Sequence, residues 1–426
     1  MKKLKWWGLV ALAAAGMVLA GCGGSGDSSS SASLRLANAT LTHPSLDLLI
    51  NSTVAVSGTT SDTVSAYVGP GSGSNTLQLN DAGAGTALAT TVPTLTGDMH
   101  YTLFAYESSG AVKTVVLNED QAAPVSGTVL LRVYNVAGDA GKLDVYITDP
   151  SVDLANANSP ISFTSGTVPA SAGYGTYSPG TYRVRVTGYG NKSDLRLDMP
   201  AVTLTNQQVA TVVLSPASGG VLLNGSTLIQ QSTYTATRNT NVRVRLAAAV
   251  SGTGTSVAAS AGGTAIDAGS TAPAFGFYTL VSASGALNIT VNGASVGAPA
   301  TPLVAGSDMT LLVYGSPGSA TSTLITDDNR LPTDATTVKM RLINGVTGNV
   351  GALTLTANTS PVGIGIQPAA ASSYVSVPSS LNAMNLALTS SVHGAYQANT
   401  SNVLNANTVY SVLATGDVSA PVLLIR

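Results

Sequence analysis

The sequence predicts an all-β protein built from about four tandem β-sandwich domains. Three observations carry this prediction. Only 9% of the 426 residues are charged and 44% are hydrophobic, which excludes a disordered polyelectrolyte. Short runs rich in Val, Leu, Thr and Tyr are broken by Gly, Pro, Asn, Asp and Ser, a pattern typical of sandwiches. A strand centred on arginine also recurs roughly once per hundred residues, as expected of a repeated domain.

Residues 1–21 have the organisation of a secretion signal. Three lysines precede an apolar run over residues 6–19, and small residues follow it. That run, of about 14 residues, is shorter than the roughly 20 that span a bilayer. Residues 19–22 (LAGC) resemble a bacterial lipobox, with the only cysteine of the chain, Cys22, at the acylated position. The alternative is an ordinary signal peptide followed by an unrelated cysteine.

A lipidated Cys22 would make the membrane the first partner of the mature chain, because several acyl chains give stable anchoring. Gly23 follows it instead of Asp, which by resemblance to bacterial sorting rules favours the outer membrane. Residues 22–32 are rich in Gly and Ser and are predicted to form a flexible tether. We therefore expect a lipid-anchored protein of the cell envelope, on its periplasmic or surface side.

Beyond the tether, strand patterns of two kinds alternate along the chain. Residues 181–186 (TYRVRV) and 242–246 (VRVRL) alternate strictly between apolar and polar, as half-buried strands do. Residues 208–214 and 308–314 are more continuously apolar. Both kinds are short and are bounded by turn residues, which supports β-sandwiches rather than helices.

The same features recur in one order in each repeat: an arginine strand, a second strand, a tyrosine and a late apolar strand. The arginines are Arg35, Arg132, Arg245 and Arg341, the tyrosines Tyr67, Tyr174, Tyr278 and Tyr374, and the late strands 101–106, 208–214, 308–314 and 408–413. Acidic linkers containing proline close the units. The predicted domains are residues 33–127, 128–238, 239–334 and 335–426, and the second strand of the third unit is indistinct.

The second unit contains residues 131–140 (LRVYNVAGDA), 143–146 (LDVY) and 178–184 (SPGTYRV). These segments resemble elements of a bacterial family, the domain of unknown function 4397. The resemblance is strongest in the second unit, weaker in the first and fourth, and weakest in the third. It implies exported proteins, often with tandem copies, and an Ig-like β fold. It implies no activity.

Two arginine–aspartate spacings suggest ion pairs. Arg35 precedes Asp47 by the same interval as Arg132 precedes Asp144. Alternation puts Leu131, Val133, Leu143 and Val145 on one face of their strands and the charged residues on the other. If the two strands form a hairpin, the charges would be cross-strand partners that set its register. The alternative is a polar patch that faces a ligand.

One linker gathers acidic residues that could bind calcium. Asp327, Asp328 and Asp334 lie close together in sequence, and hard cations need several oxygen ligands. The run lacks the spacing of a calcium loop. A solvated turn is the alternative interpretation and the favoured one.

Few residues are suited to catalysis. His43, His100 and His393 fall in different units, and no nucleophile elbow, phosphate loop or zinc motif is present. We expect no cofactor and no enzymatic activity, with an enzyme of unrecognised site as an alternative. The formal net charge of −2 excludes a basic nucleic-acid surface.

The expected function is that of a non-catalytic structural or adhesion module that contacts envelope proteins or surface polymers. An alternative is glycan binding through tyrosine-lined faces, because four tyrosines cluster in the second unit: Tyr174, Tyr177, Tyr182 and Tyr189. Packing within the sheets is the structural interpretation of the same tyrosines. A third possibility is assembly by addition of edge strands.

Overall fold

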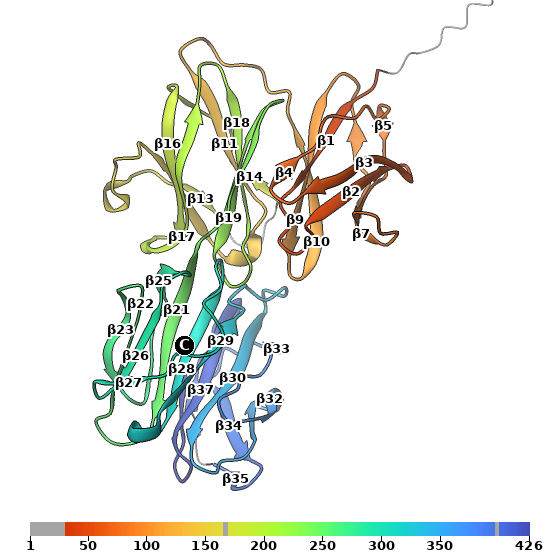
Figure 1. The fold of residues 1–426 in the computed structure, drawn as a ribbon. Helices are drawn as coiled ribbons and strands as arrows, with labels where there is room; N and C mark the ends of the chain where they lie inside the picture. The colour runs from red at the N-terminus through yellow and green to blue at the C-terminus, as the bar shows by residue number, and fades with distance from the viewer. Residues whose placement is uncertain (1–29, 165–168, 397–399) are drawn as a thin grey trace, which may run out of the picture.

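The computed structural model describes residues 30–164, 169–396 and 400–426 (Figure 1). Within these ranges strands are joined by turns and by three short 3-10 segments: Gly138–Ala140, Leu154–Asn156 and Pro317–Ser319. The predicted all-β class of tandem sandwiches is confirmed. Among the described residues, no helix has the length and apolarity needed to cross a membrane.

Each of the four units contains two facing sheets with one shared topology. The first strand pairs in parallel with the late strand, and the late strand pairs antiparallel with the strand that follows it. The second strand lies in the other sheet. We call the sheet that carries the recurring arginine the arginine sheet, and its partner the second sheet.

Domains 1 and 2 occupy residues 33–118 and 129–237 (Figure 1). The arginine sheet of domain 1 contains β10 (Ala111–Asn118), β9 (His100–Ser108), β1 (Ser33–Asn38) and β4 (Thr63–Val64). Its second sheet contains β3 (Thr53–Thr60), β2 (Ser45–Ile50), β6 (Leu77–Asp81) and β7 (Ala87–Thr91), and β5 (Gly73–Ser74) pairs separately with β8 (Thr94–Leu95). The arginine sheet of domain 2 contains β14 (Ala170–Ser171), β15 (Gly175–Tyr177), β11 (Val129–Asn135), β18 (Val209–Pro216), β19 (Leu223–Ile229) and β20 (Tyr234–Thr237). Its second sheet contains β13 (Ile161–Phe163), β12 (Leu143–Thr148), β16 (Gly180–Gly188) and β17 (Asn191–Leu204).

Domains 3 and 4 occupy residues 241–327 and 337–425. The arginine sheet of domain 3 contains β24 (Ala274–Phe275), β25 (Thr279–Ser282), β21 (Asn241–Val250), β28 (Asp308–Gly315) and β29 (Thr321–Asp327). Its second sheet contains β23 (Thr264–Thr271), β22 (Ser256–Ala261), β26 (Leu287–Val291) and β27 (Ala294–Val296). The arginine sheet of domain 4 contains β33 (Val375–Pro378), β30 (Thr337–Thr347), β37 (Thr408–Asp417) and β38 (Val422–Ile425). Its second sheet contains β32 (Ser360–Ile366), β31 (Leu353–Ala357), β34 (Met384–Ser390), β35 (Gly394–Ala395) and β36 (Thr400–Asn402).

Each domain has its own apolar core between its two sheets. In domain 2, Leu131 and Val133 of β11 meet Leu143 and Val145 of β12 in this core. Alternate residues of a strand face opposite sides, so the sequence pattern correctly identifies these inward positions. In domain 3 the strand that was indistinct in the sequence is β22, whose inward residues are the small Val257, Ala259 and Ala261.

The outer faces of the arginine sheets are also buried, because domains dock in pairs. Domains 1 and 2 meet through an apolar cluster that includes Ala37, Phe104 and Val213. Domains 3 and 4 meet through Ala247, Ala249, Phe275, Leu312, Ile343 and Leu413. Here Gly345 permits a close approach, because a Cβ at this position would lie 2.7 Å from that of Ala249. Burial on both faces explains why the late strands are continuously apolar.

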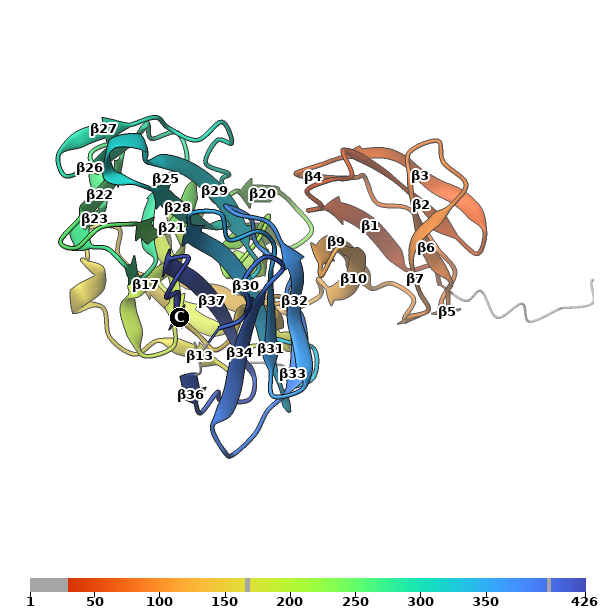
Figure 2. The ribbon, with the colours of Figure 1, turned by 90° about the horizontal axis from the view of Figure 1, so that it is seen from below.

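Polar contacts of the linker residues connect the two pairs. In the view of Figure 2, domain 1 lies to one side of domains 3 and 4. Arg238, between domains 2 and 3, reaches back to domain 1, where it pairs with Asp62 at 2.6 Å and donates to Thr40 O. Arg330, between domains 3 and 4, donates to Ala217 O of domain 2 at 2.6 Å. Leu331 N donates to Asp139 O of domain 2 at 2.8 Å.

The last residues of the predicted tether lie against domain 1. Asp98 N donates to Ser31 O at 3.0 Å, and Ala32 N donates to Pro70 O at 2.9 Å. The backbone contacts of domain 1 therefore begin before residue 33. Residues 1–29, which include the predicted signal and Cys22, lie outside the described residues.

Candidate functional site

A guanidinium occupies the same place in the arginine sheet of all four domains. Its Nε donates to a hydroxyl on the parallel neighbouring strand, directly opposite in register, over 2.9–3.1 Å. The pairs are Arg35–Thr102, Arg132–Thr211, Arg245–Thr310 and Arg341–Ser411. The recurrence in the sequence therefore corresponds to one structural element that is repeated four times.

Each of these guanidiniums also stacks on the recurring tyrosine of its unit. The carbon at the centre of the guanidinium lies 4.6–4.9 Å from the ring centroid in the pairs Arg35–Tyr67, Arg132–Tyr174, Arg245–Tyr278 and Arg341–Tyr374. A desolvated contact of this type contributes about 2 kcal/mol. The tyrosines thus cover the arginines instead of forming open faces.

In the first pair of domains, Glu119 completes this element. The guanidinium of Arg35 holds both carboxylate oxygens of Glu119, at 3.0 Å from Nε and 2.6 Å from Nη2. From domain 2, Gln231 N donates to Glu119 at 2.7 Å, and Ser232 O accepts from Arg35 at 2.6 Å. The ion pair therefore connects domain 1 to the turn between β19 and β20.

In the second pair, Asp327 takes the corresponding place and is shared by two domains. Arg341 of domain 4 donates to Oδ1, and Arg245 Nη2 of domain 3 lies 3.5 Å from Oδ2. Tyr278 and Thr310 donate to the same Oδ2. Asp327 is 0% exposed and Arg341 is 2% exposed, so the pair is fully withdrawn from water.

Burial shifts the pKa values of these clusters. It raises the pKa of Tyr278 to about 12 and that of Tyr67 well above its usual range, where the charge of Glu119 adds to the effect. Burial also lowers the pKa of Arg341, although a guanidinium remains charged at neutral pH. The phenols therefore stay protonated and can donate hydrogen bonds to the carboxylates.

The predicted pairs Arg35–Asp47 and Arg132–Asp144 are wrong. The first two strands of each unit belong to opposite sheets, so Arg132 and Asp144 point away from opposite sides of the sandwich core. Asp144 instead accepts from Ser162 at 2.5 Å and from Gly190 N at 2.8 Å. Asp47 accepts from the backbone of Gly58 and Gly83, at 2.8 and 2.9 Å.

The acidic linker does not form the proposed calcium site. Asp327 is occupied by the arginines, Asp328 pairs with Lys339 at 2.6 Å, and Asp334 accepts from its neighbour Thr336. Among the described residues, no group of three His, Cys, Asp or Glu side chains is arranged to hold a metal. Ion pairing with Arg245 and Arg341 explains the acid at position 327.

The three histidines remain apart. His43 lies 2.7 Å from Asp81 and His100 lies 3.0 Å from Asp120, while His393 contacts Asn349 O at 3.0 Å. None of the five cavities described for this structure is lined by histidine.

The tyrosine cluster of the second unit separates into different environments. Tyr174 stacks on Arg132 in the arginine sheet. Tyr177 and Tyr182 meet edge to face, with centroids 5.5 Å apart. Tyr189 is exposed beside Lys142. These four side chains do not form one continuous face.

The sequence analysis missed Glu119 as the partner of Arg35. It assigned both Glu119 and Asp327 to acidic linkers. A signal was present, because each acid follows the hydroxyl of the late strand by 17 residues, as in Thr102–Glu119 and Thr310–Asp327. It also missed Arg243 and Arg426, which line cavities at the junction of domains 2, 3 and 4.

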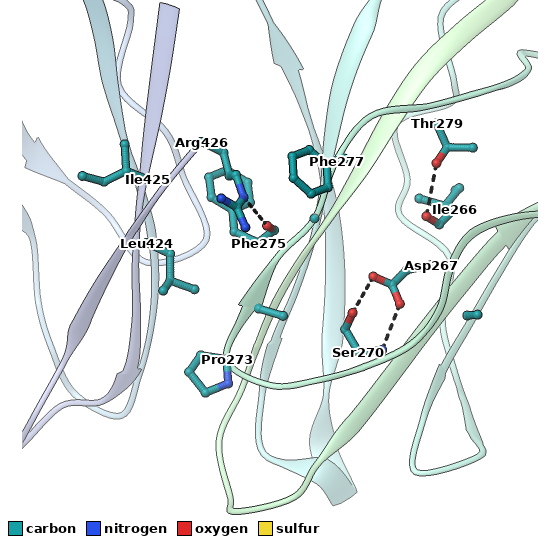
Figure 3. Close-up of a pocket in the computed structure, with 13 residues that line it drawn as sticks. Ile266, Asp267, Ser270, Pro273, Phe275, Phe277, Thr279, Leu424, Ile425 and Arg426 are labelled. Atoms are coloured by element: carbon teal, nitrogen blue, oxygen red, sulfur yellow. Dashed lines mark hydrogen bonds between the residues drawn. The ribbon is translucent and has the colours of Figure 1, made fainter. Parts of the chain in front are cut away.

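The largest of these cavities, about 620 Å³, opens between domains 3 and 4 (Figure 3). Pro273, Phe275 and Phe277 of domain 3 line one side, and Leu424 and Arg426 the other. Arg426 donates to Phe275 O at 3.1 Å and stacks on Phe277 at 4.8 Å. Hollows of about 350 and 280 Å³ adjoin it through Phe277 and Arg426.

Comparison with known protein families agrees with the resemblance noted in the sequence. Residues 32–146 match the family described as Domain of unknown function (DUF4397). The matched segment covers domain 1 and continues through β11 and β12, where the resemblance opens in domain 2. The later element at 178–184 lies outside the matched range.

No curated protein matches the chain. Among solved structures, a protein of Bacteroides uniformis described as a "putative cell adhesion protein" is similar at 14% sequence identity. The alignment covers 48% of this chain and 99% of that one, with a TM-score of 0.21.

Proposed function

We propose that this protein is a lipid-anchored component of the cell envelope that acts as a structural and interaction module and not as an enzyme. The observation that carries the proposal is the docking of four sandwiches through their arginine sheets. This arrangement uses the buried arginines for assembly and leaves strands of the second sheets, such as β3 and β23, largely exposed. Exposed sheets and loops on a rigid scaffold are suited to contact with other molecules.

The anchor is supported by the sequence. The lipobox-like residues 19–22 place Cys22 directly before a Gly/Ser-rich stretch, and the first domain begins about ten residues later. Such a tether would hold the four-domain body close to one membrane face. The outer membrane is the membrane that Gly23 favours, and envelope proteins or surface polymers are the expected partners.

The anchor is tested by Cys22→Ser in the full-length chain, expressed in a Gram-negative host and fractionated. We expect the unmodified chain in the membrane fraction, with a lipid-sized mass increase on its amino-terminal peptide. The Cys22→Ser chain should be released into the soluble fraction with unchanged thermal unfolding, because position 22 precedes the domains. Equal membrane retention of both chains would contradict lipid anchoring.

The enzyme alternative has a specific candidate in His43 and Asp81, whose side chains are in direct contact. In our proposal this contact fixes the loop before β2. His43→Ala should therefore change the stability of domain 1 only. Loss of a turnover activity detected in envelope extracts, without loss of folding, would favour the enzyme instead.

A further inference from the structure

Four arginines line the cavity of about 280 Å³ at the junction of domains 2, 3 and 4: Arg196, Arg243, Arg245 and Arg426. No Asp or Glu side chain belongs to its lining. Three acids pair with these arginines: Asp194 with Arg196, Asp308 with Arg243, and Asp327 with Arg245. Asp194 also lines the adjoining cavity of about 350 Å³. The charged side chains that line this hollow are therefore all cations, and low-dielectric walls strengthen the field inside such a hollow.

Aromatic rings hold these guanidiniums in fixed orientations. The ring of Tyr278 lies 4.7 Å from the guanidinium of Arg243 and 4.6 Å from that of Arg245. Phe275 packs against Arg245 at 4.2 Å, and Phe277 packs against Arg426 at 4.8 Å. Stacking occupies the faces of a guanidinium and leaves its N–H edges for planar anions.

Several N–H donors of these stacked arginines have no hydrogen-bond partner or only a distant one. Arg245 is 3% exposed, and its Nη2 makes no hydrogen bond within the described residues but lies 3.5 Å from Asp327 Oδ2. Arg243 makes one long bond, of 3.4 Å, to Asp308 and lies 3.9 Å from Asp194. Arg426 donates from Nε to Phe275 O. A buried cation with unused donors is costly unless another group satisfies it.

The repeats show that the sandwich itself does not require this charge. Two residues before the recurring arginine, domain 3 has Arg243 where domains 1, 2 and 4 have Ser33, Leu130 and Lys339. All four domains adopt the same sheet topology. Arg243 is therefore an addition to the shared element, placed where domains 2 and 4 close the cavity.

An apolar ring adjoins the cationic hollow. Phe277 is 76% exposed and lines the cavities of about 620 and 350 Å³, which share Arg426, Arg243 and Tyr278 with the arginine-lined one. In Figure 3 its ring lies beside Arg426 at the edge of domain 3. A large exposed aromatic ring beside positive charge fits a ligand that has both an anionic group and a flat apolar face.

We propose that this groove binds an acidic saccharide. Its carboxylate lies against Arg243 and Arg426, and its sugar ring lies on Phe277. The inference rests on the proposed interaction role, for which it names a ligand class. Phosphate shares the anionic chemistry of a carboxylate, so the test separates a free oxyanion from a sugar acid.

The test is calorimetric titration of the full-length protein in detergent with trigalacturonic acid, its neutral methyl ester and inorganic phosphate. We expect the acid to bind, the ester to bind at least tenfold more weakly, and added salt to weaken binding by screening. Arg243→Gln and Arg426→Gln should each lower affinity about tenfold or more, since a hydrogen bond between charged groups is lost. Phe277→Ala should lower affinity for the saccharide without affecting phosphate.

Lys339→Gln is the matched control, because it removes a cation from the equivalent strand position outside the arginine-lined cavity. It should leave affinity unchanged, and thermal unfolding of each variant shows that it is folded. Equal binding of acid and ester, or affinities unaffected by Arg243→Gln, Arg426→Gln and Phe277→Ala, would overturn the proposal. If phosphate bound as tightly as the saccharide in both the parent and Phe277→Ala, the proposal that the site recognises a sugar ring would be overturned. None of these failures would alter the fractionation result for Cys22→Ser, which tests the envelope role separately.

Discussion

At the residue scale, the recurring arginine is buried in domains 1, 3 and 4 and partly buried in domain 2, and its polar and flat surfaces have partners. Its Nε meets a hydroxyl of the parallel strand, its face meets a tyrosine, and in domains 1 and 4 its Nη2 meets a carboxylate. A charged group withdrawn from water is tolerated only with such compensation. The arginine therefore couples the interior of one domain to the surface of the next.

We predict that Arg341→Gln destabilises the protein by about 3–5 kcal/mol, because it removes the arginine of domain 4 that pairs with the buried carboxylate of Asp327. Arg183→Gln is the control, since Arg183 and Asp198 form a partly exposed pair and such pairs contribute about 0–1 kcal/mol. Chemical denaturation of both variants measures the difference. If both variants lost a similar amount of unfolding free energy, the buried cluster would stabilise the protein no more than a partly exposed ion pair does.

The buried phenols predict a loss of stability at high pH. Burial raises the pKa values of Tyr106, Tyr234 and Tyr278 to about 12, above the usual value of about 10 for a phenol. A raised folded-state pKa gives a contribution that is constant below the unfolded pKa and is lost as pH rises through the folded one. The free energy of unfolding should therefore fall between about pH 10 and pH 12, and less steeply in Tyr278→Phe. An identical slope in parent and variant would exclude Tyr278 as a source.

Residue identities alone predicted part of this element. The recurrence of arginine and tyrosine was visible in the sequence, and so were the inward positions Leu131 and Val133. The partner acids were assigned wrongly, because the interval from Arg132 to Asp144 suits a hairpin as well as a crossing between sheets. Glu119 lies 84 residues after Arg35 in the sequence, and only the folded structure shows that their side chains form an ion pair.

At the element scale, the arginine sheets differ from ordinary sandwich sheets because both of their faces are covered. In β18 every residue is buried, whereas in β23 most residues are exposed or partly exposed. Alternation therefore predicts the strands of second sheets well. Continuous apolar runs mark the strands that have a core on one side and a partner domain on the other.

We predict that Ile343→Glu separates domains 3 and 4. Ile343 is fully buried in the interface cluster, and a lone carboxylate there would lack any compensating charge. We expect the free energy of unfolding to fall by at least about 2 kcal/mol and the calorimetric unfolding transition to split in two. Ile364→Glu is the matched control, because Ile364 is 71% exposed on β32 and the change should cost less than about 0.5 kcal/mol. A single unchanged transition in Ile343→Glu would contradict the docking.

Docking between domains was not predictable from strand patterns. The sequence shows that a strand is apolar on both faces, but the second covering surface can belong to a neighbouring domain or to another molecule. Here the small side chains Ala247 and Ala249, together with Gly345, let the two sheets approach closely. Their partners become evident only in the assembled structure.

At the scale of the whole molecule, one sandwich topology is repeated four times and assembled as two docked pairs. The family match covers residues 32–146, which include one complete copy and the opening of the next. Linker residues then connect the pairs, as Arg238 and Arg330 do by contacting domains other than their neighbours in sequence. The fold of a single unit could be predicted from the sequence. The linker contacts could not, because they depend on how the four domains are arranged relative to one another.

The central claim is that these four sandwiches form one rigid body and not a flexible string. Small-angle X-ray scattering of residues 30–426 tests it directly. A rigid body predicts a radius of gyration within about 5 Å of the roughly 21 Å expected for a compact chain of this length, with a single-peaked distance distribution. A much larger radius, with separate peaks at the spacing of successive domains, would contradict the claim.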